Sequence, residues 1–277
     1  MFSFVVAKLF LNIHCCYDLC HVFGYFYLII FEDQFLTNMN DKSIAEFVKE
    51  NQNASKVFDK YGIDYCCGGK INFMEYCLKK NLDPILIINE IGTDIDNVGQ
   101  ISFQDINKWP ADLICDYIEK THHRYLKEFF EIVETKMEKL INKHSFKHPE
   151  LIEIRNIIKS AQYELLMHLK KEELILFPAI KKIVTANLNN LPTEDFAFGC
   201  IANPINAMEN EHNHEGERLE SIKKITNNFT PPEDACQTYK SVYNMLKVFS
   251  DDMHKHVYIE NHILFPKVLS LEKKINF

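Results

Sequence analysis

The chain has 277 residues, almost half of them hydrophobic, and a formal net charge of -8. This length allows one or two domains with a substantial core, and this hydrophobic content excludes a globally disordered chain. The acidic balance and the lack of a Lys/Arg cluster exclude a typical nucleic-acid-binding surface. The nine cysteines lack the regular spacing of a disulfide framework and favour a reducing, cytoplasmic location.

Residues 1–38 form an apolar, aromatic leader that fits no standard targeting segment. Polar side chains interrupt it at Lys8, His14, Asp18 and His21. A membrane span needs about 20 apolar residues with few charges, and a signal peptide needs a basic start and a small-residue cleavage site. Two hypotheses remain open: translation begins at Met39, so that the leader is not part of the native protein, or the leader is a degenerate membrane anchor.

Residues 39–104 are predicted to form a small helical domain. Short apolar patterns with capping residues predict four brief helices around a Cys-Cys-Gly-Gly turn at residues 66–69. The polar segment GTDIDNVGQ at residues 92–100 is predicted to be a linker to the next domain.

Residues 105–277 are predicted to form an antiparallel four-helix bundle, which makes the whole chain all-α. Four long stretches have helical periodicity, and breaks rich in Pro, Asn and capping acids separate them at residues 144–150, 187–195 and 227–234. Two of these stretches contain a His-x-x-x-Glu pair followed by the same sequence Ile-Leu-Phe-Pro, namely HLKKEELILFP and HVYIENHILFP.

Both pairs fall within the apolar stripe of their helix. His168 and Glu172 continue a three-four spacing of apolar residues, and His256 and Glu260 do the same in the last stretch. The other two stretches each direct one histidine inward, which this spacing identifies as His122 and His212. His123, His214, His254 and His262 fall off the stripes and are predicted to lie on the surface.

Buried carboxylates and imidazoles need a compensating partner, and a metal ion supplies one. Residues four apart lie one helical turn from each other, so each pair directs a nitrogen and an oxygen to one point. Such ligands suit iron or manganese, and zinc is an alternative. We predict a dinuclear site in which each metal has two histidines and Glu172 and Glu260 bridge the metals. A lone His-x-x-x-Glu is usually a solvated pair, but the duplication favours metal binding.

The bundle resembles hemerythrin-like domains, and KVFDKYGIDYCCGGK at residues 56–70 resembles the N-terminal signature of iron-sulfur cluster repair di-iron proteins. This resemblance covers residues 43–266. It implies a centre of two non-haem irons, carboxylate-bridged and with an oxo or hydroxo bridge, and it implies the ligands His122, His168, Glu172, His212, His256 and Glu260. Oxygen-carrying hemerythrins have a further histidine where this chain has Gly216, which argues against an oxygen carrier.

The resemblance also implies a function: repair of iron-sulfur clusters damaged by oxidative or nitrosative stress, through iron delivery or nitric-oxide chemistry. Damaged iron-sulfur proteins are the implied partners, and nitric oxide or oxygen the small ligands. Cys66 and Cys67 are then predicted to be a redox or iron-transfer dithiol, whose thiolates Lys60 and Lys70 would favour. A sensor of oxygen or nitric oxide and an iron-buffering bundle are the alternatives, and the sequence leaves a homodimer open.

The remaining polar candidates have weaker support. Glu164 and Glu211 lie close to predicted ligands and are either proton-steering or metal-entry groups or ordinary surface acids. His144 lies near the first break, where an outer role at the metal site and a solvent role are both consistent with the sequence. Four further cysteines are predicted to be packing residues, namely Cys77, Cys115, Cys200 and Cys236.

Overall fold

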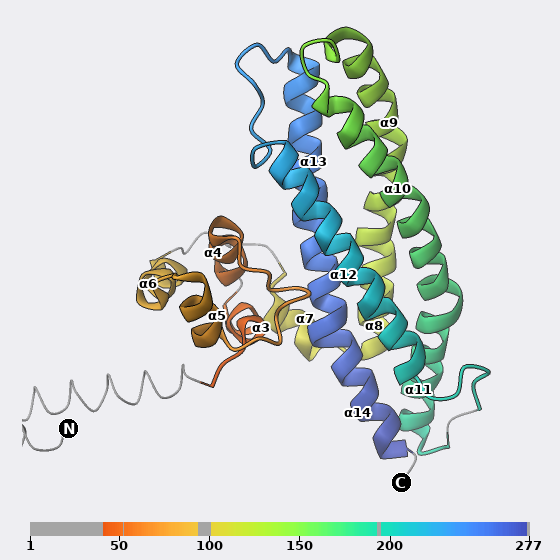
Figure 1. Cartoon of the computed structure of the whole chain (residues 1–277). Helices are drawn as coiled ribbons and strands as arrows, with labels where there is room; N and C mark the ends of the chain where they lie inside the picture. Colours follow the sequence, from red (N-terminus) through yellow and green to blue (C-terminus); the bar gives the residue numbers. More distant parts are fainter. Residues whose placement is uncertain (1–40, 52, 94–100, 193–194, 276–277) are drawn as a thin grey trace, which may run out of the picture. The chain divides into compact units, whose positions relative to one another are not determined.

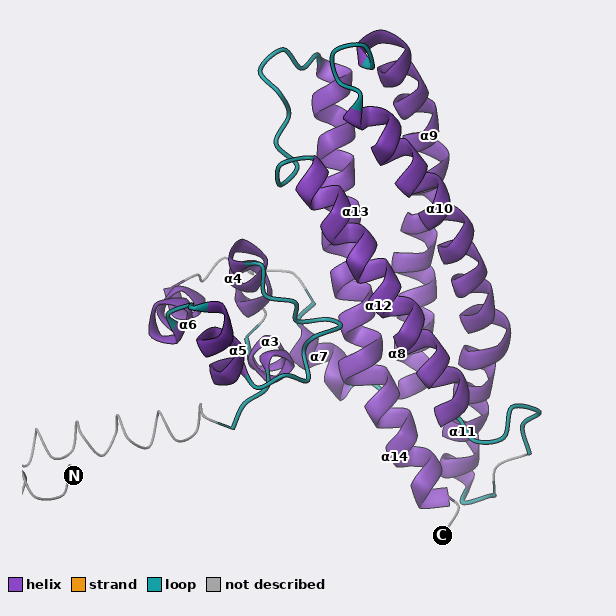
Figure 2. Ribbon diagram, viewed as in Figure 1, coloured by secondary structure: helices purple, strands orange, loops and turns teal. Residues whose placement is uncertain are grey.

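The computed structural model describes residues 41–51, 53–93, 101–192 and 195–275 (Figure 1). Within these residues the structure consists of helices, loops and two isolated bridges, without a strand (Figure 2), which confirms the predicted all-α class. None of the described helices is long and apolar enough to cross a membrane. The leader and the proposed start at Met39 lie outside the described residues.

The chain folds as two structural units of unequal size. The described part of the smaller unit comprises residues 41–43 and 71–84. Its helix α5 (Phe73–Lys80) begins after Asn72, whose side chain accepts a hydrogen bond from the Glu75 N–H, and ends at Asn81 in the left-handed region with φ 53°. Both ends therefore satisfy backbone groups that the helix leaves unpaired.

The larger unit begins with residues 44–70 and resumes at residue 85. It contains α3 (Ile44–Glu50), α4 (Asn53–Tyr61) and, from its second residue on, α6 (Pro84–Thr93). These short helices occur in the part of the chain for which short apolar patterns predicted them.

The rest of the larger unit is the bundle. A short helix, α7 (Phe103–Lys108), precedes it. In the described part of the chain, the bundle has four long helices, three of which contain a π-helical turn, labelled η. The first is α8 (Ala111–Ile118), η1 (Glu119–His123) and α9 (Arg124–His144), and the second is α10 (Glu150–Lys171), η2 (Glu172–Leu176) and α11 (Phe177–Asn189). The third is α12 (Ala202–Ile225), and the fourth is α13 (Gln237–Ile259), η3 (Glu260–Leu264) and α14 (Phe265–Ile275). Helix α9 packs against α10 and α13, and α10 packs against α12 (Figure 1). The loops between the long helices lie at the three predicted breaks.

Three of the four long helices contain a π-helical turn, and each of these turns includes a buried polar residue of the bundle interior. One half of the interior is apolar: Phe129 stacks on Phe249 with ring centroids 4.4 Å apart. The other half contains the π turns. Because a π turn inserts one residue into the helical repeat, it changes which side chains point inward, and such turns occur often at functional sites.

Candidate metal centre

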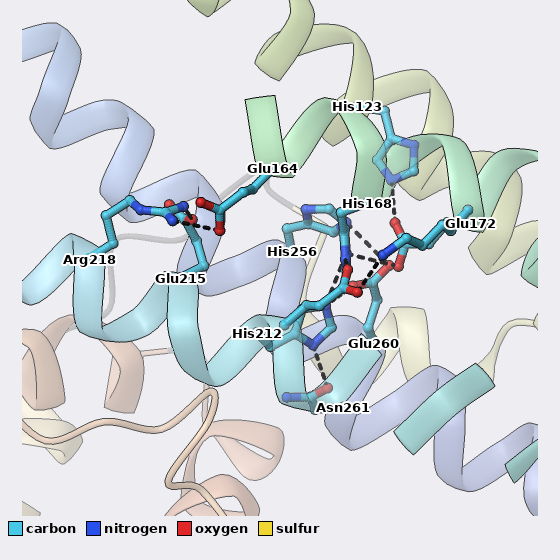
Figure 3. A network of polar contacts seen from close by, with 12 residues as sticks. His123, Glu164, His168, Glu172, His212, Glu215, Arg218, His256, Glu260 and Asn261 are labelled. Carbon is cyan, nitrogen blue, oxygen red and sulfur yellow. Dashed lines mark hydrogen bonds and ion pairs between the residues drawn. The ribbon is translucent and has the colours of Figure 1, made fainter. Parts of the chain in front are cut away.

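Six buried polar side chains converge inside the bundle (Figure 3). They come from all four long helices, and we call them the ring: His123, His168, Glu172, His212, His256 and Glu260. They form two groups able to hold a metal ion, one with His123 and His256 and the other with His168 and His212. Both groups contain both glutamates.

Glu172 directs its two oxygens to histidines of different groups. Its Oε2 lies 3.2 Å from His123 Nε2, and its Oε1 lies 3.3 Å from His168 Nε2. Both oxygens are buried and have no partner in hydrogen-bond geometry. The side chain is therefore arranged as a carboxylate between two cation positions.

Glu260 repeats this arrangement from the opposite side of the interior. Its Oε1 lies 3.2 Å from His256 Nε2, and its Oε2 lies 3.2 Å from His212 Nε2. The Oε2 atom is again buried without a hydrogen-bond partner. Since an unpaired carboxylate oxygen is costly to bury, these atoms fit a site that binds metal.

His123, not His122, belongs to this ring, and the sequence-based choice between the two adjacent histidines is corrected. The three-four spacing counts four residues from the buried Ile118 to reach His122. The π turn η1 intervenes, so the next inward position is five residues on, at His123. His122 instead lies 2.9 Å from Asp252 Oδ1 and stacks on His256 with centroids 5.4 Å apart.

The electrostatics keep both glutamates ionised. Burial and Glu260 would raise the pKa of Glu172, but His168 and His123 hold it below its ordinary value. Burial would also raise the pKa of Glu260, yet His256 and His212 hold it well below that value. Carboxylates are metal ligands in this ionised form.

Three histidines of the two candidate groups have an outer hydrogen-bond partner on Nδ1, which leaves Nε2 available for a metal. His123 Nδ1 lies 2.9 Å from Glu173 Oε1, and His168 Nδ1 lies 2.8 Å from Glu211 Oε2. His212 Nδ1 lies 2.9 Å from Asn261 Oδ1. Such partners orient a metal-binding imidazole.

Helical periodicity did not identify Glu173 and Asn261 as outer partners, and for Glu211 it left two roles open. Each of the three is the chain neighbour of a predicted ligand, which is the one signal that could have identified them. Glu211 also pairs with Lys171, and His168 and Lys171 together lower its pKa to about 2. Glu211 is therefore an ionised carboxylate that His168 and Lys171 hold in place.

A cavity of about 350 Å³ reaches two of the candidate ligands, His168 and His212. Glu164 and Glu215 also line it, and Arg218 pairs with both carboxylates (Figure 3). Burial raises the pKa of Glu215 to about 7 despite Arg218. Glu164 is thus part of the cavity lining rather than a ligand.

The two adjacent cysteines form a tight turn around Asp64. The carboxylate of Asp64 accepts the N–H groups of Cys66 and Cys67 at 3.0 and 2.9 Å and that of Gly68 at 2.9 Å. Gly69 is required because a Cβ there would lie 2.3 Å from a backbone oxygen. The two sulfurs lie 3.7 Å apart, and with Asp64 they form a third group able to hold a metal ion.

The expectation that Lys60 and Lys70 favour the thiolates is wrong. Lys60 pairs with Glu90 and Lys70 with Glu209, each within 2.8 Å. The hydrogen bond with Cys67 and burial raise the pKa of Cys66 well above its ordinary value. Cys66 is therefore a buried thiol, whereas Cys67 is partly exposed.

Several other histidines and cysteines differ from their predicted exposure. The sequence predicted surface positions for four histidines, and this is wrong for three of them: His123 is buried, and His254 and His262 are half-buried. His214 is exposed as predicted. His144 lies 3.3 Å from Cys236 Sγ, outside both histidine groups. Cys77 and Cys115 are buried as packing residues, but Cys200 is exposed and Cys236 half-buried, so the packing prediction is wrong for these two.

The helical fold and the shared-glutamate ring define a class of protein. The family model described as the hemerythrin HHE cation binding domain matches residues 116–268 and includes all six ring residues. A second family model, ScdA_N, described as a domain of unknown function, matches residues 40–94 and includes the two adjacent cysteines. The class is thus a hemerythrin-type cation-binding bundle preceded by an ScdA_N segment.

Whole-chain relatives define the family more narrowly. The iron-sulfur cluster repair protein YtfE of Enterobacter sp. is 35% identical over 84% of this chain and 98% of its own length. A probable iron-sulfur cluster repair protein of Haemophilus influenzae is 33% identical over 83% and 97%, and ScdA of Staphylococcus haemolyticus is 29% identical over 82% and 98%. The chain belongs to the family of iron-sulfur cluster repair proteins.

Proposed function

We propose that this chain repairs iron-sulfur clusters damaged by oxidative or nitrosative stress and that it does so with a di-iron centre. One observation carries the proposal: Glu172 and Glu260 each divide their two oxygens between two histidine groups. Two carboxylates in this arrangement suit a pair of bridged metals rather than one. The relatives are iron-sulfur cluster repair proteins, which supports a damaged cluster in another protein as the substrate.

The chain's own residues hold and expose this centre. Four histidines and two ionised glutamates supply nitrogen and oxygen ligands without a thiolate, a set that suits iron. When bound, iron supplies reversible one-electron chemistry and ferrous ions for transfer. The cavity at His168 and His212 gives a small molecule or a chelating partner access to one side of the site.

The dithiol has a supporting role in this proposal. Cys67 is the more accessible of the two thiols, so we assign it contact with incoming iron or with nitric oxide, and we assign Cys66 the role of a buried partner. The six cysteines in the described part of the chain are all free, which fits a reducing cytoplasm as the place of action.

Repair of a nitric-oxide-damaged [4Fe-4S] enzyme tests this function. We expect the iron-loaded protein to restore the enzyme's activity, and we expect Glu260→Ala to restore no more than an equal amount of free ferrous iron does. Loading the protein with ⁵⁷Fe separates the two routes: label in the repaired cluster indicates iron delivery, while repair without label indicates nitric-oxide removal. Equal repair by free iron and by wild type would refute the proposal.

A further inference from the structure

Asn261 connects a proposed metal ligand to the turn that carries the two cysteines. It is the second residue of η3, follows Glu260 and is 6% exposed. Its Oδ1 lies 2.9 Å from His212 Nδ1, and its Nδ2 donates to the Cys66 carbonyl at 3.3 Å. One side chain thus contacts both the ring and the turn with Cys66 and Cys67, which we call the cysteine turn (Figure 3 shows the contact with His212).

These two contacts fix the tautomer of His212. A carbonyl only accepts hydrogen bonds, so the amide NH₂ must face Cys66 and the amide oxygen must face His212. His212 therefore carries its proton on Nδ1, and its Nε2 lone pair is free for a metal. The opposite tautomer needs a rotated amide, which would place Oδ1 against the Cys66 carbonyl and break this link.

The cysteine turn has further contacts with the same helices. His262 Nε2 donates to the Cys66 carbonyl at 2.8 Å, and the Cys67 thiol donates to the His212 carbonyl at 3.4 Å. A Cβ at Gly216, one turn after His212, would lie 3.4 Å from Cys67 Sγ. The turn therefore rests on the backbone next to the metal ligand, and Asn261 is one of the side chains that hold it there.

We propose that Asn261 is a positioning residue that holds His212 in its metal-binding tautomer and, through the Cys66 carbonyl, couples occupancy of the metal site to the exposure of Cys67. The proposal rests on the metal site of the proposed function. A metal on His212 Nε2 keeps the proton on Nδ1, fixes the amide of Asn261 and secures the cysteine turn. Without a metal, Asn261 alone holds this tautomer, so the hydrogen bond to the turn opens more often.

The test uses the full-length chain as wild type, Asn261→Leu and His262→Leu. Ferrous affinity is measured anaerobically by chelator competition, and alkylation of Cys67 by iodoacetamide is followed by peptide mass spectrometry with and without saturating ferrous iron. In wild type, we expect iron to slow alkylation about fivefold, which corresponds to one hydrogen bond of about 1 kcal/mol. Asn261→Leu should bind iron about 10–100-fold more weakly and lose the effect of iron on alkylation.

His262→Leu is the matched control because His262 holds the same carbonyl but does not contact His212. We expect faster alkylation of Cys67 in this variant with unchanged iron affinity. Circular dichroism melting of each variant verifies the fold. If Asn261→Leu keeps both the affinity and the iron-dependent protection, the proposal is refuted, since iron bound directly to the thiols would give that result.

The tautomer gives a readout that does not depend on iron. Nitrogen NMR of ¹⁵N-histidine protein should show His212 protonated mainly at Nδ1 in metal-free wild type and a larger share of the other tautomer in Asn261→Leu. Identical tautomers in the two proteins would refute the role of Asn261. A wild type that binds no iron would instead refute the di-iron function and leave this NMR test in force.

Discussion

The two residue groups that could each hold a metal ion share both glutamates but differ in their surroundings. The enclosed position, with His123 and His256, is covered by rings: His123 stacks on Phe177 at 5.6 Å and His256 on His122 at 5.4 Å. The open position, with His168 and His212, borders the 350 Å³ cavity. The bundle therefore combines one enclosed group with one accessible group, and this difference suits the proposed di-iron centre if it retains one metal while it exchanges or reacts at the other.

The largest expected effect comes from a ligand that both positions share. Glu260→Ala removes two oxygens, one directed at each group, so we expect both irons to be lost. Iron per chain is measured after anaerobic reconstitution and desalting. Glu217→Ala, a change on α12 away from the ring, is the control and should keep the wild-type iron content. Retention of one iron by Glu260→Ala would contradict the shared role.

The enclosed position can be tested by changing one of two adjacent histidines. His123→Ala should reduce the iron content to about one per chain or less, because a first-row metal loses one of its few protein ligands. His122→Ala should keep the wild-type iron content and lower the melting temperature modestly, since it removes the pair with Asp252. The reverse result would show that η1 does not set the register of this helix.

The open position should lose its iron sooner than the enclosed one. We expect two phases when a ferrous chelator extracts iron, with the fast phase from the His168/His212 position. Glu211→Gln weakens the orientation of His168 and should lower the iron affinity of this position about 10–100-fold, whereas Glu173→Gln should affect the slow phase. A single phase for wild type would indicate equivalent positions.

The last prediction concerns the pH dependence of stability at the cavity wall rather than iron binding. The pKa of Glu215 is raised to about 7 from an ordinary 4.5, so the folded state binds this proton more tightly than the unfolded state does. Its contribution is present below pH 4.5 and is lost as the pH rises to 7. As the pH rises from 4.5 to 7, the free energy of unfolding of Glu215→Gln should therefore increase by about 3 kcal/mol relative to that of wild type, because one pKa unit is worth about 1.4 kcal/mol.

Urea unfolding of both metal-free proteins at pH 4.5 and pH 8 measures this gain. Glu217→Gln, which neutralises a more accessible acid on the same helix, should show no such trend. A constant difference in stability between Glu215→Gln and wild type at the two pH values would mean that folding does not change the pKa of Glu215.

The structure brings together those predicted residues of the candidate site that follow a regular repeat. His168 and Glu172, like His256 and Glu260, lie four apart and before or at the start of a π turn, so an ordinary helical repeat places them correctly. The adjacent histidines of η1 lie within a π turn, where that repeat fails. A pattern with 3.6 residues per turn cannot identify such a turn, because the extra residue is selected by packing and by the ligands around it.

Other errors arose where tertiary contacts outweigh local sequence. Lys60 and Lys70 flank the cysteines in the chain but pair with acids 30 and 139 residues away. Asn261 has no periodic or motif signal, since its contacts come from α12 and from the cysteine turn. The fold class depended on periodicity summed over long helices, which single exceptions do not change.

The most direct test of the two-position account is a crystal structure of the anaerobically iron-loaded protein with anomalous data at the iron edge. We expect two iron peaks, one bound by His123 and His256 and the other by His168 and His212, with Glu172 and Glu260 between both. A single peak, or a peak bound by His122 with His123 turned away, would contradict it.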